Sequence, residues 1–182
     1  MGRICVNRSG QSWPVYETNT GGTVIGNLNP NEIFTWISGT TWPGDVQRIY
    51  FKDARGVLKY GFVLHASNTD TFASFSDFGL YRVNINNKNC AVFKTRRYTN
   101  IYDTNGNPYR AVDPYTGKVI MGGTLPINSY VGTVSGTSGD SHPDWMYVDC
   151  FGPNDPSFGP GFIDVGLKVS SSPSAINLES SL

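Results

Sequence analysis

The residues best suited to chemistry gather in one polar stretch near residue 140. His142, one of two histidines in the 182-residue chain, stands between Asp140 and Asp144, and Cys150 follows in the same region. A Cys-His pair can form a nucleophile with its base, and histidine with carboxylates can bind a metal ion. Cys150, however, lies in the strand-like run 147-YVDC-150, whereas a reactive thiol favours a helix N-terminus that lowers its pKa. We therefore predict no catalytic residue and keep a Cys-His hydrolase only as a second alternative.

The other acidic residues give no stronger signal. Asp149, Asp155 and Asp164 lie close together in the sequence, but their spacing is not that of a calcium-binding loop. No glycine-rich loop leads into a helix, as a phosphate-binding loop would. The sequence predicts no metal ion and no cofactor.

Three cysteines, Cys5, Cys90 and Cys150, are widely separated along the chain. They lack the Cys-x-x-Cys spacing of a structural zinc site. The simplest interpretation is three buried or half-buried thiols in a protein made in a reducing cytoplasm. One disulfide with one free thiol is the alternative.

Composition limits the partners of the chain. The formal net charge is zero and only 15% of the residues are charged, so the basic surface that nucleic-acid binding requires is not expected. No apolar run is long enough to span a membrane, which predicts no membrane insertion. The first residues, MGRICVNRSGQSW, contain no apolar secretory signal. We expect synthesis in the cytoplasm and action outside the cell or on a particle.

The candidate residues must be positioned by β-strands. The 10 Tyr, 10 Phe and 21 Gly, with frequent Asn and Thr, are typical of an all-β protein with many turns. Helical periodicity is almost absent, and the ordered segments alternate or form short apolar runs bounded by Gly, Asn and Pro. The predicted strands are 13–17, 23–28, 32–38, 47–53, 58–65, 79–85, 90–96, 98–103, 118–125, 129–135, 145–151 and 161–167.

The two halves of the chain share a pattern, which indicates an internal repeat. The stretch 15-VYETN-19 matches 101-IYDTN-105, and 24-VIGNL-28 matches 119-VIMGGTL-125. The other matched blocks, in the same order, are 29–31 with 126–128, 34–40 with 130–137, 49–53 with 146–149, and 61–63 with 161–163. The second copy carries longer loops.

The repeated unit resembles the bacterial SH3 (SH3b) domain, a small β-barrel often attached to cell-wall enzymes. The resemblance rests on 18-TNTGG-22, 24-VIGNL-28, 29-NPNE-32 and 61-GFV-63, and the second copy is divergent. It implies an all-β chain with two small SH3-like β-barrels in tandem. The expected divisions are barrel 1 over 1–66, a linker or bridging strands over 67–96, barrel 2 over 97–168 and a flexible tail over 169–182. Whether 66–96 belongs to either barrel stays open.

Exposed aromatic side chains with nearby amides would line a binding groove on such barrels. Flat aromatic faces suit sugar rings or peptides, and amides supply hydrogen bonds. The predicted ligand-binding residues are Tyr16, Asn19, Trp42, Tyr102, Asn105, Trp145 and Tyr147. In contrast, Trp36, Tyr50 and Phe62 are expected in the barrel core.

The resemblance implies a non-enzymatic binding module for bacterial cell-wall peptide or glycan. The missing secretory signal and the lack of a catalytic domain fit a factor carried by a phage or released by lysis. The alternative is a structural component of a phage tail, virion or contractile injection particle, with protein neighbours as partners. A wall binder exposes a concave aromatic groove, whereas a particle component exposes flat apolar patches and self-assembles.

Overall fold

The computed structural model describes residues 2–7, 9–39, 45–64, 72–74, 81–85, 87–95, 97–112, 119–125, 127, 130–134, 136–148, 150–151 and 161–164. Every regular element within these ranges is a β-strand, so the predicted all-β class is confirmed. No helix long and apolar enough to cross a membrane occurs in them. The chain divides into two compact units, whose described residues come from Met1–Phe75 with Ser138–Asp144 and from Ser76–Thr137 with Trp145–Val165. This division agrees with the expected tandem of small β domains.

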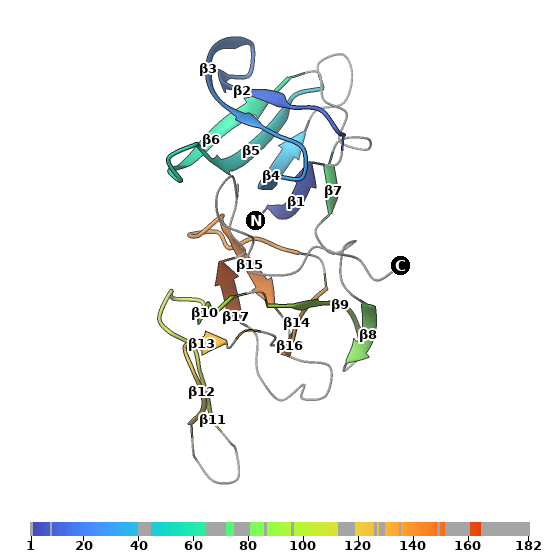
Figure 1. The fold of residues 1–182 in the computed structure, drawn as a ribbon, viewed down its shortest axis with the longest axis vertical. Coiled ribbons are helices and arrows are strands. Elements are labelled where there is room, and N and C mark those ends of the chain that lie inside the picture. Colours follow the sequence, from blue (N-terminus) through green and yellow to red (C-terminus); the bar gives the residue numbers. More distant parts are fainter. Residues whose placement is uncertain are drawn as a thin grey trace. The chain divides into compact units, whose positions relative to one another are not determined.

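The first unit contains a seven-stranded antiparallel sheet in the order β3-β2-β6-β5-β4-β1-β7 (Figure 1). Its strands are β1 (Arg3–Asn7), β2 (Trp13–Thr18), β3 (Gly21–Leu28), β4 (Ile33–Gly39), β5 (Gln47–Lys52), β6 (Leu58–Val63) and β7 (Phe72–Ser74). Strand β6 lies inside the sheet, where it pairs with β2 on one side and with β5 on the other.

The second unit contains shorter sheets, in the orders β13-β10-β17-β15, β16-β14-β9-β8 and β11-β12. Its strands are β8 (Tyr81–Ile85), β9 (Lys88–Lys94), β10 (Thr99–Tyr102), β11 (Arg110–Val112), β12 (Val119–Gly122), β13 (Thr124–Leu125), β14 (Tyr130–Thr133), β15 (Trp145–Val148), β16 (Cys150–Phe151) and β17 (Gly161–Asp164). Hydrogen bonds also join the β14 region to β15, since Thr133 Oγ1 donates to Tyr147 O at 2.9 Å and Tyr147 N donates to Thr137 O at 2.7 Å.

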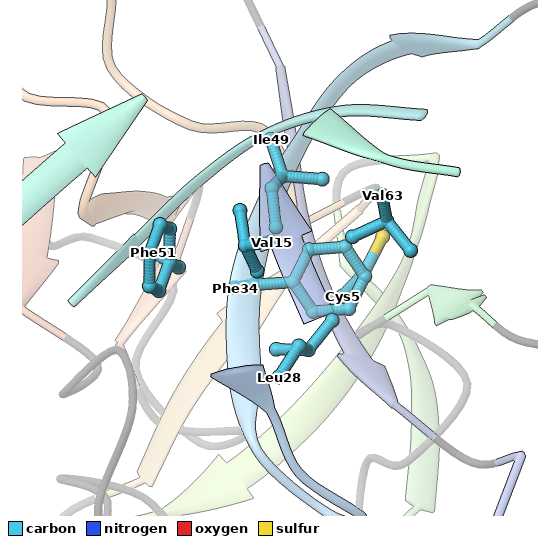
Figure 2. Close-up of a cluster of buried hydrophobic side chains, with 7 residues drawn as sticks. All are labelled: Cys5, Val15, Leu28, Phe34, Ile49, Phe51 and Val63. Carbon is cyan, nitrogen blue, oxygen red and sulfur yellow. The ribbon is translucent and has the colours of Figure 1, made fainter. Parts of the chain in front are cut away.

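A compact apolar cluster fills the interior of the first unit. Figure 2 shows its members, with the ring of Phe34 among the smaller side chains: Cys5, Val15, Leu28, Phe34, Ile49, Phe51 and Val63. These residues come from six strands, and all are at most 5% exposed. Apolar burial of this kind is the main favourable contribution to folding, so the cluster holds the strands in their register.

Alternation along the strands separates this core from an outer face. In β5, Gln47, Ile49 and Phe51 are buried, while the residues between them are exposed or half-buried. In β6, Gly61 and Val63 are buried in the same way. Successive side chains of a strand point to opposite faces, so every second residue of β5 and β6 lies on the outer face.

The strand register agrees with three of the six matched blocks of the internal repeat. Tyr16 pairs with Phe62 across β2 and β6, and Tyr102 pairs with Phe162 across β10 and β17. At the next strand, Trp13 pairs with Leu28 and Thr99 pairs with Leu125, as the matched blocks require.

One matched block is displaced by two residues. Gly61 pairs with Ile49, and the matching glycine Gly161 pairs with Val148. The structural counterpart of Val148 is therefore Ile49 and not Phe51. A shift of two preserves the side of the sheet on which each residue lies, which is why the sequence pattern could not detect it.

Three strands were not predicted: β1, β7 and β11. The first pairs with β4, and its counterpart β9 pairs with β14, so each unit has this additional strand before the matched blocks. Within the range expected to be a linker or bridging strands, β7 pairs with β1 of the first unit, while β8 and β9 pair with each other in the second unit. The exact domain boundaries stay a prediction.

Two of the three thiols are described. Cys5 and Cys90 are both buried thiols outside any disulfide, as the simplest interpretation of the sequence expects. A disulfide between any two of the three cysteines would need at least one of these, so the alternative of one bridge is wrong. The side chain of Cys150 lies outside the described part of the structure.

Candidate binding faces

Four aromatic side chains share the outer face of β10, β17 and β15 in the second unit. Tyr102, Phe162 and Tyr147 are register partners across the three strands. Tyr102 stacks on Trp145 with ring centroids 4.0 Å apart and an interplanar angle of 7°. Tyr147 and Phe162 are in tilted contact at 5.2 Å. All four are half-buried, and we call them the second face.

The alternation of the three strands explains why these rings face outward. Ile101, Met146 and Ile163, which lie beside them in the sequence, are all 0% exposed. Burial of these neighbours fixes the opposite orientation for the aromatic residues. The buried apolar side chains on the inner side therefore fix the register of the three strands and with it the position of the outer rings. A shift of the register by one residue would move these apolar side chains to the exposed face.

The first unit carries a comparable aromatic group, which we call the first face: Tyr16, Tyr50, Tyr60 and Phe62. Tyr16 and Phe62 are register partners, as are Tyr50 and Tyr60. The Tyr50–Tyr60 and Tyr60–Phe62 ring centroids are each 5.3 Å apart, in edge-to-face geometry. Edge-to-face and stacked arrangements are both favourable for aromatic pairs.

The predicted site residues thus separate into groups. Tyr102, Trp145 and Tyr147 lie together in the second face, and Tyr16 lies in the first face. Asn19 is exposed in the turn between β2 and β3, where Thr18 Oγ1 donates to Gly21 O. Trp42 lies outside the described residues.

Asn105 belongs to a tight loop that directly follows Tyr102. Asp103 Oδ1 accepts hydrogen bonds from the backbone N–H groups of Asn105 at 2.8 Å and Asn107 at 2.9 Å. Gly106 N donates to Asp103 O at 3.1 Å. The hydrogen bonds, chiefly that from Asn107 N, lower the pKa of Asp103 from its ordinary value. The carboxylate therefore fixes the loop next to the second face.

Asp53 organises the β5–β6 turn with the same Asp-x-x-Gly-x pattern. Its Oδ1 accepts from Arg55 N at 2.9 Å and Val57 N at 3.0 Å, and Gly56 N donates to Asp53 O at 2.9 Å. Lys59 Nζ lies 3.1 Å from Asp53 Oδ2. The Val57 bond, followed by those from Lys59 and Arg55, lowers the pKa of Asp53 from 3.8 to about 2.

The placement of some aromatic residues differs from expectation. Tyr50 and Phe62 were expected in the core, but both are half-buried on the outer face. The sequence signal was present, because Phe62 alternates with the small or apolar Gly61 and Val63, which are buried. Trp36 is also half-buried; it packs against the core cluster, and its Nε1 donates to Gln47 Oε1 at 2.9 Å.

The candidate catalytic residues fall in different units. Asp140 and His142 are exposed in Ser138–Asp144, which belongs to the first unit, whereas Cys150 is in β16 of the second unit. Among the described residues, no group of three or more His, Cys, Asp or Glu is placed to hold a metal ion.

No protein-family model and no curated protein sequence matches this chain. Two solved structures show a distant similarity. NlpC2 from Trichomonas vaginalis is 9% identical with a TM-score of 0.37, and the match covers 97% of this chain and 48% of that protein. NlpC1 from Trichomonas vaginalis is 10% identical with a TM-score of 0.35, with coverages of 90% and 44%. The chain thus spans less than half the length of either protein, and the function proposed below rests on the two faces.

Proposed function

We propose that this chain is a non-enzymatic binding module that recognises bacterial cell-wall peptide or glycan through its aromatic faces. The observation that carries the proposal is the second face, where the stacked Tyr102 and Trp145 adjoin Tyr147 and Phe162 on neighbouring strands. Four half-buried rings on one small sheet surface exceed what inner packing requires, because the core on the opposite side is already filled by aliphatic residues and Met146.

The chemistry of these rings suits a carbohydrate or a short peptide. Aromatic faces bury the apolar C–H surface of a ring or side chain, and phenol hydroxyls at the edge can form hydrogen bonds. Rings carried on paired strands lose little conformational entropy when they bind, since their backbone is already ordered. The second face is therefore a preorganised platform.

The polar loop beside the platform can contribute hydrogen bonds. Asn105 is exposed, and its backbone is held by Asp103, which follows Tyr102 directly. An amide can both donate and accept, which suits the hydroxyl and acetamido groups of a glycan or the main chain of a peptide. In this proposal the rings supply affinity and Asn105 supplies orientation.

The test is co-sedimentation of the purified chain with bacterial cell-wall sacculi. Tyr102→Ala and Trp145→Ala each remove one partner of the stack and should weaken binding at least about tenfold, as loss of a central aromatic anchor does. Tyr98→Ala is the matched control, because Tyr98 is 70% exposed and lies outside both faces. Circular dichroism would show that the variants remain folded.

Light scattering on the same samples separates the proposal from the structural alternative. Absence of sedimentation with sacculi, together with a defined higher oligomer, would favour a component of a phage or injection particle. Equal loss of binding in Tyr98→Ala and Tyr102→Ala would also contradict a role for the second face.

A further inference from the structure

The two faces differ at one equivalent position. In the second unit, the row across the three strands is Tyr102, Phe162 and Tyr147. In the first unit, the same row begins with Tyr16 and Phe62 but ends at Arg48, which pairs with Phe62 across β5 and β6. An arginine thus occupies the place of an aromatic residue in an otherwise matching row.

Arg48 lies beside the first face and pairs with no carboxylate among the described residues. Lys52, which shares the outer side of β5 with Arg48, forms an ion pair with Asp144 at 3.3 Å. Within the described ranges of the chain, no Asp or Glu lies within ion-pairing distance of Arg48, which is exposed.

Aromatic rings and a hydroxyl group lie near Arg48 on the same sheet. Tyr50 follows two residues later on the same side of β5, and its ring contacts Tyr60, which contacts Phe62. The residue opposite Arg48 on β4 is Ser38, a half-buried hydroxyl. The surface therefore offers a guanidinium group beside aromatic rings, whereas the second face offers aromatic rings at the corresponding row.

We propose that the first face binds a carboxylate-bearing sugar of the wall glycan, with Arg48 holding the carboxylate and the rings of Tyr16 and Phe62 packing on the sugar. This inference rests on the proposed function and adds the ligand class of one of its faces. A guanidinium group binds a carboxylate with two parallel hydrogen bonds, a geometry that an ammonium group does not reproduce.

The position of the strands favours a glycan over a peptide at this face. Extended peptides are commonly bound by pairing with an exposed strand edge. Here β6 is paired on both sides, by β2 and β5, and β5 is also paired with β4. The first face therefore presents side chains and no free backbone edge, and flat rings with one cation match an acidic sugar.

The experiment measures binding of two soluble probes by isothermal titration calorimetry. The first probe is a peptide-free oligosaccharide of alternating N-acetylglucosamine and N-acetylmuramic acid. The second is the same oligosaccharide with its carboxyl groups reduced to alcohols. The variants are Arg48→Gln, Arg48→Lys and the matched control Arg3→Gln. Arg3 is exposed on β1. Its partner on β4 is Trp36, which is opposite Ile49 on β5, whereas Arg48 is opposite Ser38, so Arg3 and Arg48 do not lie in the same row across the sheet.

The wild-type chain should bind the carboxylated probe about tenfold more tightly than the reduced probe, as expected for a charge-assisted hydrogen bond. Arg48→Gln should abolish this preference, Arg48→Lys should restore only part of it, and Arg3→Gln should keep it. Raised salt should weaken binding of the carboxylated probe more than that of the reduced probe.

The outcomes distinguish this inference from the proposed function. If the wild-type chain sediments with sacculi but binds both probes equally, the acidic-ligand inference is wrong while the wall-binding function stands. The same conclusion follows if Arg48→Gln and Arg3→Gln retain an equal preference. If the chain binds neither sacculi nor either probe, both proposals fail.

Discussion

The side chain of Asn7 links the end of β1, the first strand of the chain, to its surroundings by hydrogen bonds. It is 0% exposed, yet its Nδ2 donates to Gln11 O at 2.8 Å and to Leu28 O at 3.1 Å. Its Oδ1 accepts from Ser9 N at 3.1 Å and Ser9 Oγ at 2.7 Å. One amide thus connects the end of β1, the following loop and the end of β3.

Replacing Asn7 tests this network. Asn7→Ala should lower the free energy of unfolding by about 1–3 kcal/mol, because the buried carbonyl of Leu28 loses its side-chain donor and the loop loses its acceptor. Urea denaturation followed by tryptophan fluorescence measures the loss. The matched control Asn89→Ala, at an exposed position of β9, should change stability by less than about 0.5 kcal/mol. Equal effects would contradict the network.

Asp53 gives a prediction for acid stability. Its folded pKa of about 2 lies below the ordinary value of 3.8, so the ionised form favours the folded state. Its stabilising contribution is complete above pH 3.8 and is lost as the pH falls from there to about 2. The thermal unfolding midpoint of the wild-type chain should fall as the pH is lowered through this window. The midpoint of Asp53→Asn should depend less on pH over the same range. A wild-type decline that Asp53→Asn leaves unchanged would contradict the assignment.

At the scale of elements, a glycine in the middle strand allows the neighbouring strand and core to pack closely in both units. A Cβ at Gly61 would lie 2.5 Å from Val15 Cγ1 and 3.1 Å from Ile25 Cδ1. A Cβ at Gly161 would meet Tyr102 O at 3.0 Å and Ile101 Cγ1 at 3.2 Å. Both glycines leave little room for a Cβ, and the atoms around Gly61 lie closer than those around Gly161.

The two glycines should therefore respond differently to substitution. Gly61→Ala should destabilise the chain by about 1–3 kcal/mol, since the new methyl group overpacks a filled core. Gly161→Ala should cost less, because its nearest neighbours need to move by only a few tenths of an ångström. Denaturant titration of both variants measures the difference. A larger loss for Gly161→Ala would show that the packing of the two units is not as described.

At the scale of the whole molecule, the first unit is completed by a segment from much later in the sequence. Ser138 N donates to Gly2 O at 3.0 Å, and Gly2 N donates to Ser138 Oγ at 3.0 Å. The hydroxyl of the buried Thr35 donates to Pro143 O, and Asp144 pairs with Lys52. The unit therefore depends on contacts that a contiguous stretch of sequence cannot supply.

Removing one of these contacts should loosen the segment. Thr35→Val keeps the side-chain shape but removes the donor to Pro143 O, and should cost about 1–3 kcal/mol. Hydrogen exchange of the Ser138 amide should become faster relative to the wild-type chain. The control Thr124→Val removes an exposed hydroxyl, which bonds Asn100 Oδ1 at 3.3 Å, and should leave the Ser138 amide unchanged. Unchanged exchange in Thr35→Val would contradict the role of this contact.

Local features of the sequence determined the all-β class, most of the strands and the internal repeat. Alternation along a strand and the turn residues around it are properties of neighbouring residues, so they can be recognised without the fold. The stretch 53-DARG-56 carries the Asp and Gly that are typical of the tight turn found there. Tyr16 and Tyr102 were matched by their local sequence alone, before their register partners were known.

Only the tertiary structure decided which distant residues share a face. Tyr102 and Trp145 are 43 positions apart in the numbering, and their stacking depends on β17 pairing between β10 and β15. The opposition of Arg48 to Phe62 and the docking of Ser138–Asp144 depend likewise on pairing between separated segments. Strand pairing is set by the sum of many weak non-local contacts, and a register displaced by two residues leaves the same hydrophobic pattern, so the sequence could not specify it.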